Sequence, residues 1–451
     1  MVVELVGFGV ESMSVIRACR DTMQCMTAIS RASAALAAFF ILFSTAAKPV
    51  VAANREKVLH SFGNGKDGSH PWAALISDAG GHLYGTTVWG GAYNLGSIFQ
   101  LTRGANGSWT EKLIHCFGKG TDGANPLAGL TFDAGGNLYG TTVSGGVLYA
   151  GTVFRLSPKG NGEWSETVLH NFGGGDGSEP YAAVILDQAG NIYGTTNLGG
   201  AHDGGSVFKL APDANGKWTV TVLYSFCAIS DCADGYAPSA GVVLDKKGNL
   251  YGTTPYGGAY HGGVAFRLTR GANGHWSEIV LHNFGKDKDG YSPFAGLVFD
   301  TSGSLYGATA GGGAFGVSCG PGAGCGTVFK LTRCRNGRWS ERVLHSFGSG
   351  KDGYNPVGDL VLDTSGNLYG TTSDGGAFGS QCGYAGCGTA FKVTHCKRGQ
   401  WSERVLHNFG NGSDGASPFG ALILDASGNL YGTTQFGGRF NDGGTVFEIT
   451  P

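Results

Sequence analysis

The sequence has few charged residues and no bias towards either sign. Lys and Arg total 31 and Asp and Glu 33 among 451 residues, so charged residues make up 14% of the chain and the net charge is −2. There is no basic stripe or run of like charges, which argues against binding to nucleic acid or to an anionic membrane. Sustained helical periodicity is also missing from the repeats described below. Glycine, in contrast, is abundant at 83 residues without a three-residue period, which excludes collagen and is typical of tight turns.

A Tyr-Gly-Thr-Thr phrase, or a close variant, is repeated along the chain at intervals of 54 to 63 residues. The copies begin at Tyr84, Tyr139, Tyr193, Tyr251, Tyr306, Tyr369 and Tyr431. A period of this length indicates a repeat architecture. Each unit, as in residues 126–172, contains four short runs rich in β-branched and aromatic residues, bounded by Gly, Asp, Asn or Pro, which is typical of strands. The pattern predicts an all-β fold, a seven-bladed β-propeller with four-stranded blades.

Turn residues and the two ends of the repeat region support this prediction. Asn-Gly pairs such as Asn161-Gly162 join the third and fourth runs and are the strongest short signal for a hairpin. Asp-x-x-Gly, as at 187–190, joins the first and second runs, where Asp can bond the turn backbone. The last unit has only three strands, and residues 56–62 are an isolated copy of the fourth. We expect residues 56–62 to pair with residues 446–450 and close the ring in a 3+1 blade.

Residues 1–54 are interpreted as a leader and residues 55–451 as the propeller. An apolar run at 32–47 follows Arg17, Arg20 and Arg31, and small residues at 46–53 offer cleavage sites, which resembles a secretory signal peptide. A single membrane anchor is the alternative, although about 16 apolar residues are short for a span. We therefore expect a secreted, periplasmic or cell-surface protein that is monomeric and free of the membrane after cleavage.

Closely spaced cysteines lie inside loop insertions of three repeats, and an exported protein can oxidise them to local disulfides. The expected pairs are Cys227 with Cys232, Cys319 with Cys325, and Cys382 with Cys387. Metal binding by cysteine is the alternative, but no second C-x₂-C pair with zinc spacing is present, and no metal site is expected. Cys116 is predicted to be buried and free, and the partners of Cys334 and Cys396 stay open.

Histidine and aspartate recur once in nearly every unit, which favours structural roles over catalysis. The fourth run carries His within Val-Leu-His-x-Phe, and strict alternation would place this His beside Val and Phe on one face. One Asp set ends the first strands and is expected to cap turns. A second set precedes Gly and either caps turns or surrounds one channel mouth, where it could concentrate cations. Its members are Asp67, Asp122, Asp176, Asp234, Asp289, Asp352 and Asp414. Calcium is the one cofactor considered, although no Asp-x-Asp-x-Asp-Gly loop is present.

Positions that vary between units are the candidates for ligand binding. Aromatic residues occupy loops that enter the first strand or leave the second, and these loops should emerge on one face. The candidate residues are Trp72, Trp89, Tyr181, Tyr256, Phe294 and Phe419. Exposed rings with polar neighbours suit sugars or peptide segments, whereas the alternative is that the rings pack over the loops as small satellite cores. Asp359 replaces a small residue of the other units near the channel and is added to the candidate site.

Five phrases carry a resemblance to a known family. They are Pro-x-Ala-Gly-Leu (293–297), Asp-x-x-Gly-Asn-Leu-Tyr-Gly-Thr-Thr (363–372), Gly-Gly-Ala (375–377), Gly-Thr-Val-Phe-Lys-Leu-Thr (326–332) and Val-Leu-His-Ser-Phe (343–347). Together they resemble the GloVer tandem repeat of exported bacterial proteins. The resemblance implies an exported surface or secreted protein and brings no activity, cofactor or catalytic residue.

The function that best fits these observations is an exported binding module for a carbohydrate or another extracellular ligand, such as a protein. One alternative is a lyase or hydrolase with its site at the channel mouth, although no catalytic motif stands out. The other is a purely structural surface protein. The fold does not discriminate among them, because propellers carry unrelated functions.

Overall fold

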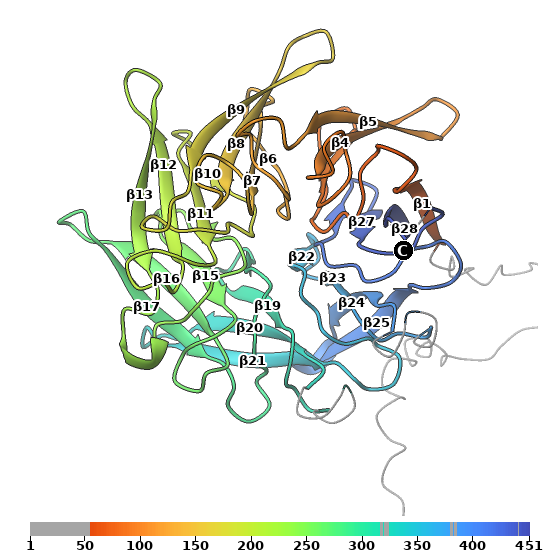
Figure 1. Cartoon of the computed structure of the whole chain (residues 1–451). Helices are drawn as coiled ribbons and strands as arrows, with labels where there is room; N and C mark the ends of the chain where they lie inside the picture. The colour runs from red at the N-terminus through yellow and green to blue at the C-terminus, as the bar shows by residue number, and fades with distance from the viewer. Residues whose placement is uncertain (1–54, 316–318, 320–323, 379–381, 383–385, 441) are drawn as a thin grey trace, which may run out of the picture. The chain divides into compact units, whose positions relative to one another are not determined.

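The computed structural model describes residues 55–315, 319, 324–378, 382, 386–440 and 442–451. Within these residues, 28 strands form seven four-stranded antiparallel sheets arranged as the blades of a ring (Figure 1). Two short 3₁₀ helices, η1 (Ser230–Cys232) and η2 (Lys397–Gly399), lie in connecting loops. Among the described residues no helix is long and apolar enough to span a membrane. The prediction of a seven-bladed all-β propeller is confirmed, while the proposed leader lies outside the described residues.

Blades 1 to 7 are named after the order of their first strands. The first strands are β2 (Ile76–Ser77), β6 (Thr131–Phe132), β10 (Ile185–Leu186), β14 (Val243–Leu244), β18 (Val298–Phe299), β22 (Val361–Leu362) and β26 (Ile423–Leu424). The second strands carry the Tyr-Gly-Thr-Thr phrase and are β3 (Leu83–Thr87), β7 (Leu138–Thr142), β11 (Ile192–Thr196), β15 (Leu250–Thr254), β19 (Leu305–Thr309), β23 (Leu368–Thr372) and β27 (Leu430–Thr434).

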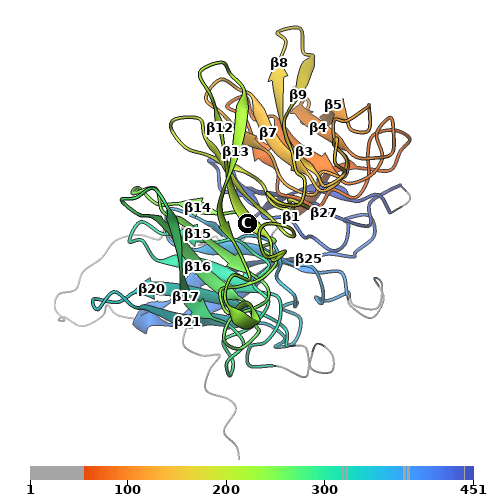
Figure 2. The same ribbon diagram turned by 60° about the vertical axis from the view of Figure 1, so that its left-hand side comes forward.

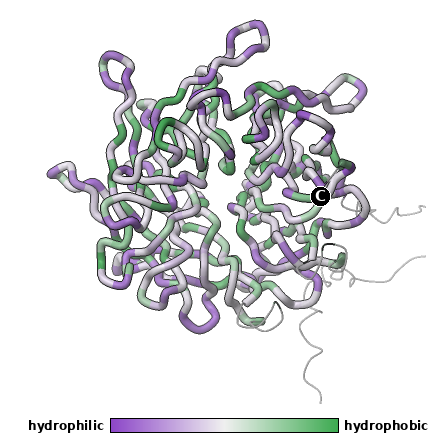
Figure 3. Tube along the Cα trace, viewed as in Figure 1, coloured by the Kyte–Doolittle hydropathy of each residue, from purple (hydrophilic) through white to green (hydrophobic). Residues whose placement is uncertain are grey.

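The outer half of each blade is a longer hairpin. The third strands are β4 (Ser97–Arg103), β8 (Thr152–Pro158), β12 (Ser206–Pro212), β16 (Val264–Arg270), β20 (Thr327–Arg333), β24 (Thr389–His395) and β28 (Thr445–Thr450). The fourth strands lie outermost and are β5 (Trp109–Cys116), β9 (Trp164–Asn171), β13 (Trp218–Ser225), β17 (Trp276–Asn283), β21 (Trp339–Ser346), β25 (Trp401–Asn408) and β1 (Arg55–Ser61). The β8–β9 and β12–β13 hairpins extend beyond the body of their sheets (Figure 2), and the projecting hairpin tips are hydrophilic (Figure 3).

The N-terminal strand closes the ring as predicted. β1 pairs antiparallel with β28, from Arg55 opposite Thr450 to Ser61 opposite Thr445. Blade 7 therefore has the order β1-β28-β27-β26, with its fourth strand supplied from the other end of the repeat region. β28 therefore has a hydrogen-bonded strand on each side, as every other third strand does.

The Tyr-Gly pair of the repeated phrase links a turn to the packing inside a blade. In blade 1 the Tyr84 hydroxyl donates to Asp78 Oδ2 at 3.0 Å and so braces the turn between the first two strands. Gly85 lies against the Phe99 ring, and a Cβ atom at this position would stand 2.5 Å from Phe99 Cζ. Glycine is therefore needed because the ring of the third strand covers the backbone of the second.

The two threonines of the phrase connect strands and blades. Thr86 Oγ1 donates to the carbonyl oxygen of Ala128, 3.0 Å away in the segment that enters the next blade. The hydroxyl of Thr87 lies 2.7 Å from that of Ser97 on the neighbouring strand. Both threonines are buried, so these hydrogen bonds satisfy groups that would otherwise be costly to bury.

The hydrophobic core is divided among the boundaries between blades. At each boundary the Phe that follows a fourth strand packs against the Phe of the third strand in the next blade, with ring centroids 4.9–5.1 Å apart. The pairs are Phe62–Phe99, Phe117–Phe154, Phe172–Phe208, Phe226–Phe266, Phe284–Phe329, Phe347–Phe391 and Phe409–Phe447. Each boundary thus has its own small core.

A β-bulge corrects the expected alternation of the fourth strand. In blade 5, Val343 is opposite Phe329 while His345 is opposite Val328, so one residue between them has no partner. Adjacent residues of the third strand point to opposite faces, so Val343 and His345 also do. His345 does pack edge-on against Phe347, with centroids 4.7 Å apart, but the prediction that Val shares this face was wrong.

Candidate functional site

The loops that enter each first strand and the loops between second and third strands lie together. Isolated β-bridges join them, for example Ser69 with Trp89 in blade 1 and Tyr236 with Tyr256 in blade 4. We call the surface formed by these two loop sets the loop face; in blade 1 it comprises residues 62–75 and 88–96. The expectation that the two loop sets emerge on the same face is confirmed.

The loop face carries most of the exposed apolar side chains in the described part of the chain. Of ten such side chains, nine lie in its loops, and the tenth is Ile279 on β17. Trp89 is 44% exposed and Tyr256 45% exposed, as their assignment to the candidate site requires. The others in the loop set are Tyr93, Val147, Leu148, Tyr149, Ile229, Tyr260 and Phe315.

Three of the remaining aromatic candidates, Trp72, Phe294 and Phe419, are partly buried and pack against another candidate ring. Trp72 stacks on Phe419 across the boundary between blades 7 and 1, with centroids 4.1 Å apart and planes 18° apart. Phe294 meets Tyr256 edge to face at 5.9 Å, which connects blades 4 and 5. The candidate residues therefore form two ring pairs among themselves, with Trp89 in a separate loop. The partial burial of Trp72 and Phe419 agrees with the satellite-core alternative for these two residues.

Tyr181 is held by a neighbouring carboxylate. Its hydroxyl donates to Glu179 Oε2 at 3.0 Å. Burial, with the charge and hydrogen bond of Glu179, raises the pKa of Tyr181 to about 12. The hydroxyl therefore stays protonated at neutral pH and can act only as a neutral hydrogen-bonding group.

Asp359 lies just before β22, in the innermost part of blade 6. Its Oδ1 accepts a hydrogen bond from the backbone N–H of Gly296 in blade 5, at 2.5 Å. Asp359 is exposed to solvent, but the many protein atoms around it partly desolvate its carboxylate and raise its pKa, while the hydrogen bond from Gly296 acts in the opposite direction. Asp359 thus joins two blades near the axis, and the adjacent Gly358 lies against the backbone of Phe419, a member of one aromatic pair.

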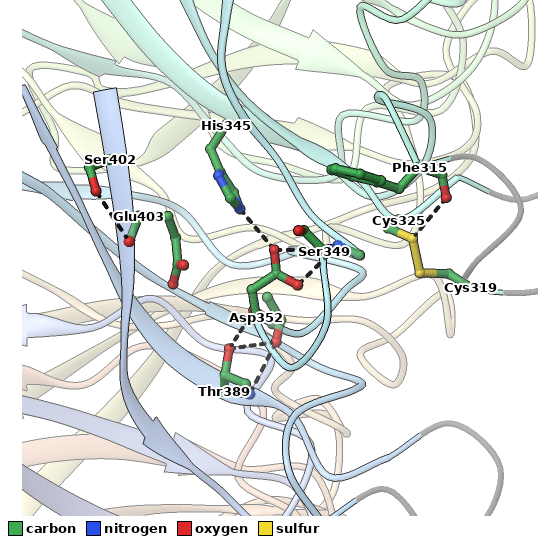
Figure 4. A network of polar contacts seen from close by, with 11 residues as sticks. Phe315, Cys319, Cys325, His345, Ser349, Asp352, Thr389, Ser402 and Glu403 are labelled. Carbon is green, nitrogen blue, oxygen red and sulfur yellow. Dashed lines mark hydrogen bonds and ion pairs between the residues drawn. A yellow bond between two sulfur atoms is a disulfide. The ribbon is translucent and has the colours of Figure 1, made fainter. Parts of the chain in front are cut away.

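The second set of aspartates caps turns, as predicted, but lies against the outermost strands instead of a channel mouth. In blade 5, Asp352 Oδ1 accepts from the N–H of Gly348 at 3.1 Å, and its Oδ2 is 3.1 Å from His345 Nε2 (Figure 4). Glu403, on the fourth strand of blade 6, belongs to the same cluster. The equivalent residues recur at other boundaries and form Glu–His–Asp clusters that the sequence interpretation missed.

Five boundaries have all three residue types, and two lack one. The complete sets are Glu56 with His407 and Asp414, Glu111 with His60 and Asp67, Glu166 with His115 and Asp122, Glu341 with His282 and Asp289, and Glu403 with His345 and Asp352. Between blades 2 and 3, Val220 takes the Glu position opposite His170 and Asp176. Between blades 3 and 4, Tyr224 takes the His position beside Asp234, across from Glu278. In the sequence a Glu stands four residues before each of these His residues, but that Glu belongs to the cluster at the other boundary of its blade, so the spacing does not reveal the contact.

Burial dominates the chemistry of the glutamates in these clusters. It raises the pKa of Glu56, Glu111, Glu166, Glu341 and Glu403 to about 7 and that of Glu278 to about 8, and the nearby aspartate adds to the shift. In all six, Oε1 is buried and accepts no hydrogen bond from the described residues. Carboxyl groups with a raised pKa thus occur at the blade boundaries near the outer strands. They lie away from the ring axis, where an active site was considered.

All three predicted disulfides are present. They join Cys227 to Cys232, Cys319 to Cys325, and Cys382 to Cys387, across five or six positions of sequence. Cys116 is in none of them, as expected. It is only partly buried, whereas the sequence predicted a buried residue. Exposed Cys334 is also outside these disulfides.

The repeated phrases and the structure agree with a comparison of the chain with known families. The sequence matches the Gloeobacter/Verrucomicrobia repeat over residues 47–234, 161–379 and 316–451. The chain belongs to this family. None of the curated proteins matches this Gloeobacter/Verrucomicrobia repeat protein.

Solved structures similar to this Gloeobacter/Verrucomicrobia repeat protein are distant in sequence. An ancestral GH74 enzyme is 13% identical with a TM-score of 0.52, over 84% of this chain and 47% of that one. A Thermus thermophilus protein described as an oxidoreductase (glucose dehydrogenase) is 17% identical with a TM-score of 0.40, over 72% of this chain and 96% of that one. A Dyadobacter fermentans protein of unknown function is 12% identical with a TM-score of 0.41, over 88% and 99%. At 13% identity, the similarity to the GH74 enzyme supports the fold alone.

Proposed function

We propose that this protein is an exported propeller that binds an extracellular carbohydrate on its loop face. The observation that carries this is the exposure of aromatic rings in its loops, including Trp89 in blade 1, Tyr256 in blade 4 and Tyr149 in blade 2, the last of which is 83% exposed. One face of a sugar ring presents C–H groups and stacks on such rings, while its hydroxyls need polar partners. A soluble protein otherwise gains little by exposing large apolar side chains on one surface.

Export is supported by the cysteines. Three loop-local disulfides persist in an oxidising compartment and are rare in the cytosol. The signal-like segment at residues 32–47 agrees with the same destination. A free ligand outside the cell, or a polysaccharide of a cell wall, is then accessible to the loop face.

A glycan array with the secreted protein, read with and without calcium, tests this function. For the best glycan, a Trp89→Ala, Tyr256→Ala double variant should bind at least about tenfold more weakly, because each stacking contact contributes about 0.5–1.5 kcal/mol beyond burial. Ile279→Ala is the matched control, since it removes an exposed apolar side chain from β17, outside the loop face. No glycan bound, or equal losses in both variants, would contradict carbohydrate binding at this face.

A further inference from the structure

We propose that the Glu–His–Asp clusters on either side of blade 6 are binding sites for a divalent transition-metal ion such as Zn²⁺. The 5/6 cluster consists of His345, Asp352 and Glu403, and the 6/7 cluster consists of His407, Asp414 and Glu56. In each cluster one ligand atom from every residue lies within 4.8 Å of the other two. Nothing in the family match or the solved relatives assigns an ion here.

The spacing of the donor atoms suits a small ion. His345 Nε2 lies 3.1 Å from Asp352 Oδ2, and His407 Nε2 lies 2.9 Å from Asp414 Oδ2. An ion with bonds of about 2.0–2.2 Å to nitrogen and oxygen holds neighbouring donors about 3.0–3.5 Å apart. The His–Asp pairs therefore need to open by only a few tenths of an ångström, while the flexible glutamate side chain covers the remaining distance.

The glutamates supply a second observation, which they share with the equivalent glutamates of the other boundaries. Oε1 of Glu403 and Oε1 of Glu56 are both buried, and neither accepts a hydrogen bond from the described residues. Asp352 and Asp414 are 7% and 6% exposed, so the second carboxylate of each cluster is also shielded from water. Buried polar atoms without a partner are rare and costly, and an ion between the two carboxylates would satisfy them.

The ligand set favours a transition metal over calcium or magnesium. One imidazole nitrogen and two carboxylate oxygens suit Zn²⁺ or a similar ion, whereas Ca²⁺ and Mg²⁺ prefer oxygen ligands alone. The histidine would bind through the Nε2 lone pair, with its proton on Nδ1. Three protein ligands leave a position for water.

The position of the two clusters gives the ions a structural consequence. Glu403 and His407 are on the same strand, β25, so one ion would join blade 6 to blade 5 and the other would join it to blade 7. Glu56 is on β1, the strand that closes the ring. The 6/7 ion would therefore fasten the closing strand to the neighbouring blade, and binding to the folded ring would raise its stability.

Solvent reaches equivalent positions at other boundaries. A hollow of about 410 Å³ is lined by Asp289 and Glu341, and another of about 270 Å³ is lined by His60 and Asp67. Ions in solution can therefore reach the equivalent residues at these two boundaries.

Zinc titration of the full-length chain, without an affinity tag and after treatment with a chelator, tests the sites. Calorimetry and native mass spectrometry should show two Zn²⁺ ions per chain, and the thermal midpoint should rise with zinc. Glu403→Gln and Glu56→Gln should each weaken one site by more than about tenfold, because even residues that only support metal ligands typically contribute 10–100-fold. Glu278→Gln is the control, since Tyr224 stands where its boundary would need histidine, and it should retain both ions.

Two results would overturn the assignment. If the unaltered chain binds no zinc, the clusters are hydrogen-bonded contacts between blades only. If both glutamine variants keep two ions at unchanged affinity, zinc binds elsewhere. Should the variants not fold, X-ray absorption at the zinc edge of the unaltered chain decides, because a nitrogen and oxygen shell with imidazole supports the sites and sulfur or water ligands alone refute them.

Discussion

Single side chains in this protein are fixed by contacts that repeat from blade to blade, and the glycine of the Tyr-Gly-Thr-Thr phrase is one example. We expect Gly85→Ala to destabilise the fold by about 1–3 kcal/mol, because the new methyl group would overlap the Phe99 ring and overpack the blade. Denaturant unfolding followed by circular dichroism measures the loss. Gly175→Ala, where no atom lies within 4 Å of the added Cβ, should be close to neutral. Equal losses in both variants would mean that the ring does not require the glycine.

Glu278 should make stability depend on pH. Its pKa is raised to about 8 by burial and then by Asp234, from 4.5 for an ordinary glutamate. Between these pH values the folded state holds a proton that the unfolded state releases, so this contribution is complete below about pH 4.5 and is lost as pH rises through about 8. Glu278→Gln removes the titration. We therefore expect the variant to gain stability relative to the unaltered chain as pH is raised from 5 to 9.

Thermal midpoints measured across this pH range check the expectation. The chain itself accepts an uncharged residue at the equivalent position, since Val220 occupies it in blade 3. Parallel curves for the two proteins would show that Glu278 titrates normally in the folded state.

Local side-chain roles could be predicted from the sequence, and contacts between blades could not. Asp133 accepts hydrogen bonds from the backbone N–H groups of Gly135 and Asn137, all within one turn, so its spacing alone predicted the role. Glu403 meets His345 only because blades 5 and 6 pack side by side, and a single strand gives no sign of that contact. The aromatic candidates were predictable in part. Their loops could be located from the sequence, but the stacking of Trp72 on Phe419 could not, because it forms only where blades 7 and 1 meet.

Strands and turns were predictable because each carries its own signal. Four runs with Asn-Gly and Asp-x-x-Gly turns predicted the sheets, which the structure confirms. The bulge between Val343 and His345 was not predictable, because both residues suit a regular strand and the extra residue is visible only in the pairing with β20.

The disulfides in the loops should contribute modestly to stability. Cys227 and Cys232 close a loop of only five positions, which limits the entropic gain to about 2 kcal/mol. A Cys227→Ser, Cys232→Ser double variant should therefore remain folded with a slightly lower thermal midpoint. Mass spectrometry of non-reduced peptides from secreted protein should find the bond in the unaltered chain. Free thiols there, or a variant that cannot fold, would contradict a loop-local role.

The closure of the ring makes one of the seven boundaries different from the others. Blade 7 is built from both ends of the repeat region, so β1 is held by its pairing with β28 and by Phe62, whereas the other fourth strands also continue covalently from the third strand. The shortfall of one strand in the last repeat and the extra copy at residues 56–62 allowed this arrangement to be predicted.

Phe62→Ala and Phe172→Ala should separate local packing from ring closure. Both rings are fully buried and meet the next blade at 4.9 and 5.1 Å, so each change should cost about 3–5 kcal/mol by removing a similar boundary contact. Only Phe62→Ala loosens a strand that has no hairpin connection to its sheet, and release of that strand would expose the edge of β28. We therefore expect limited proteolysis under native conditions to remove β1 from Phe62→Ala first, and light scattering to detect association through the exposed edge.

In Phe172→Ala the damaged boundary lies between blades 2 and 3, which the chain still connects, so β1 should stay protected. Equal protection of β1 in both variants would show that the hydrogen bonds to β28 close the ring without help from Phe62.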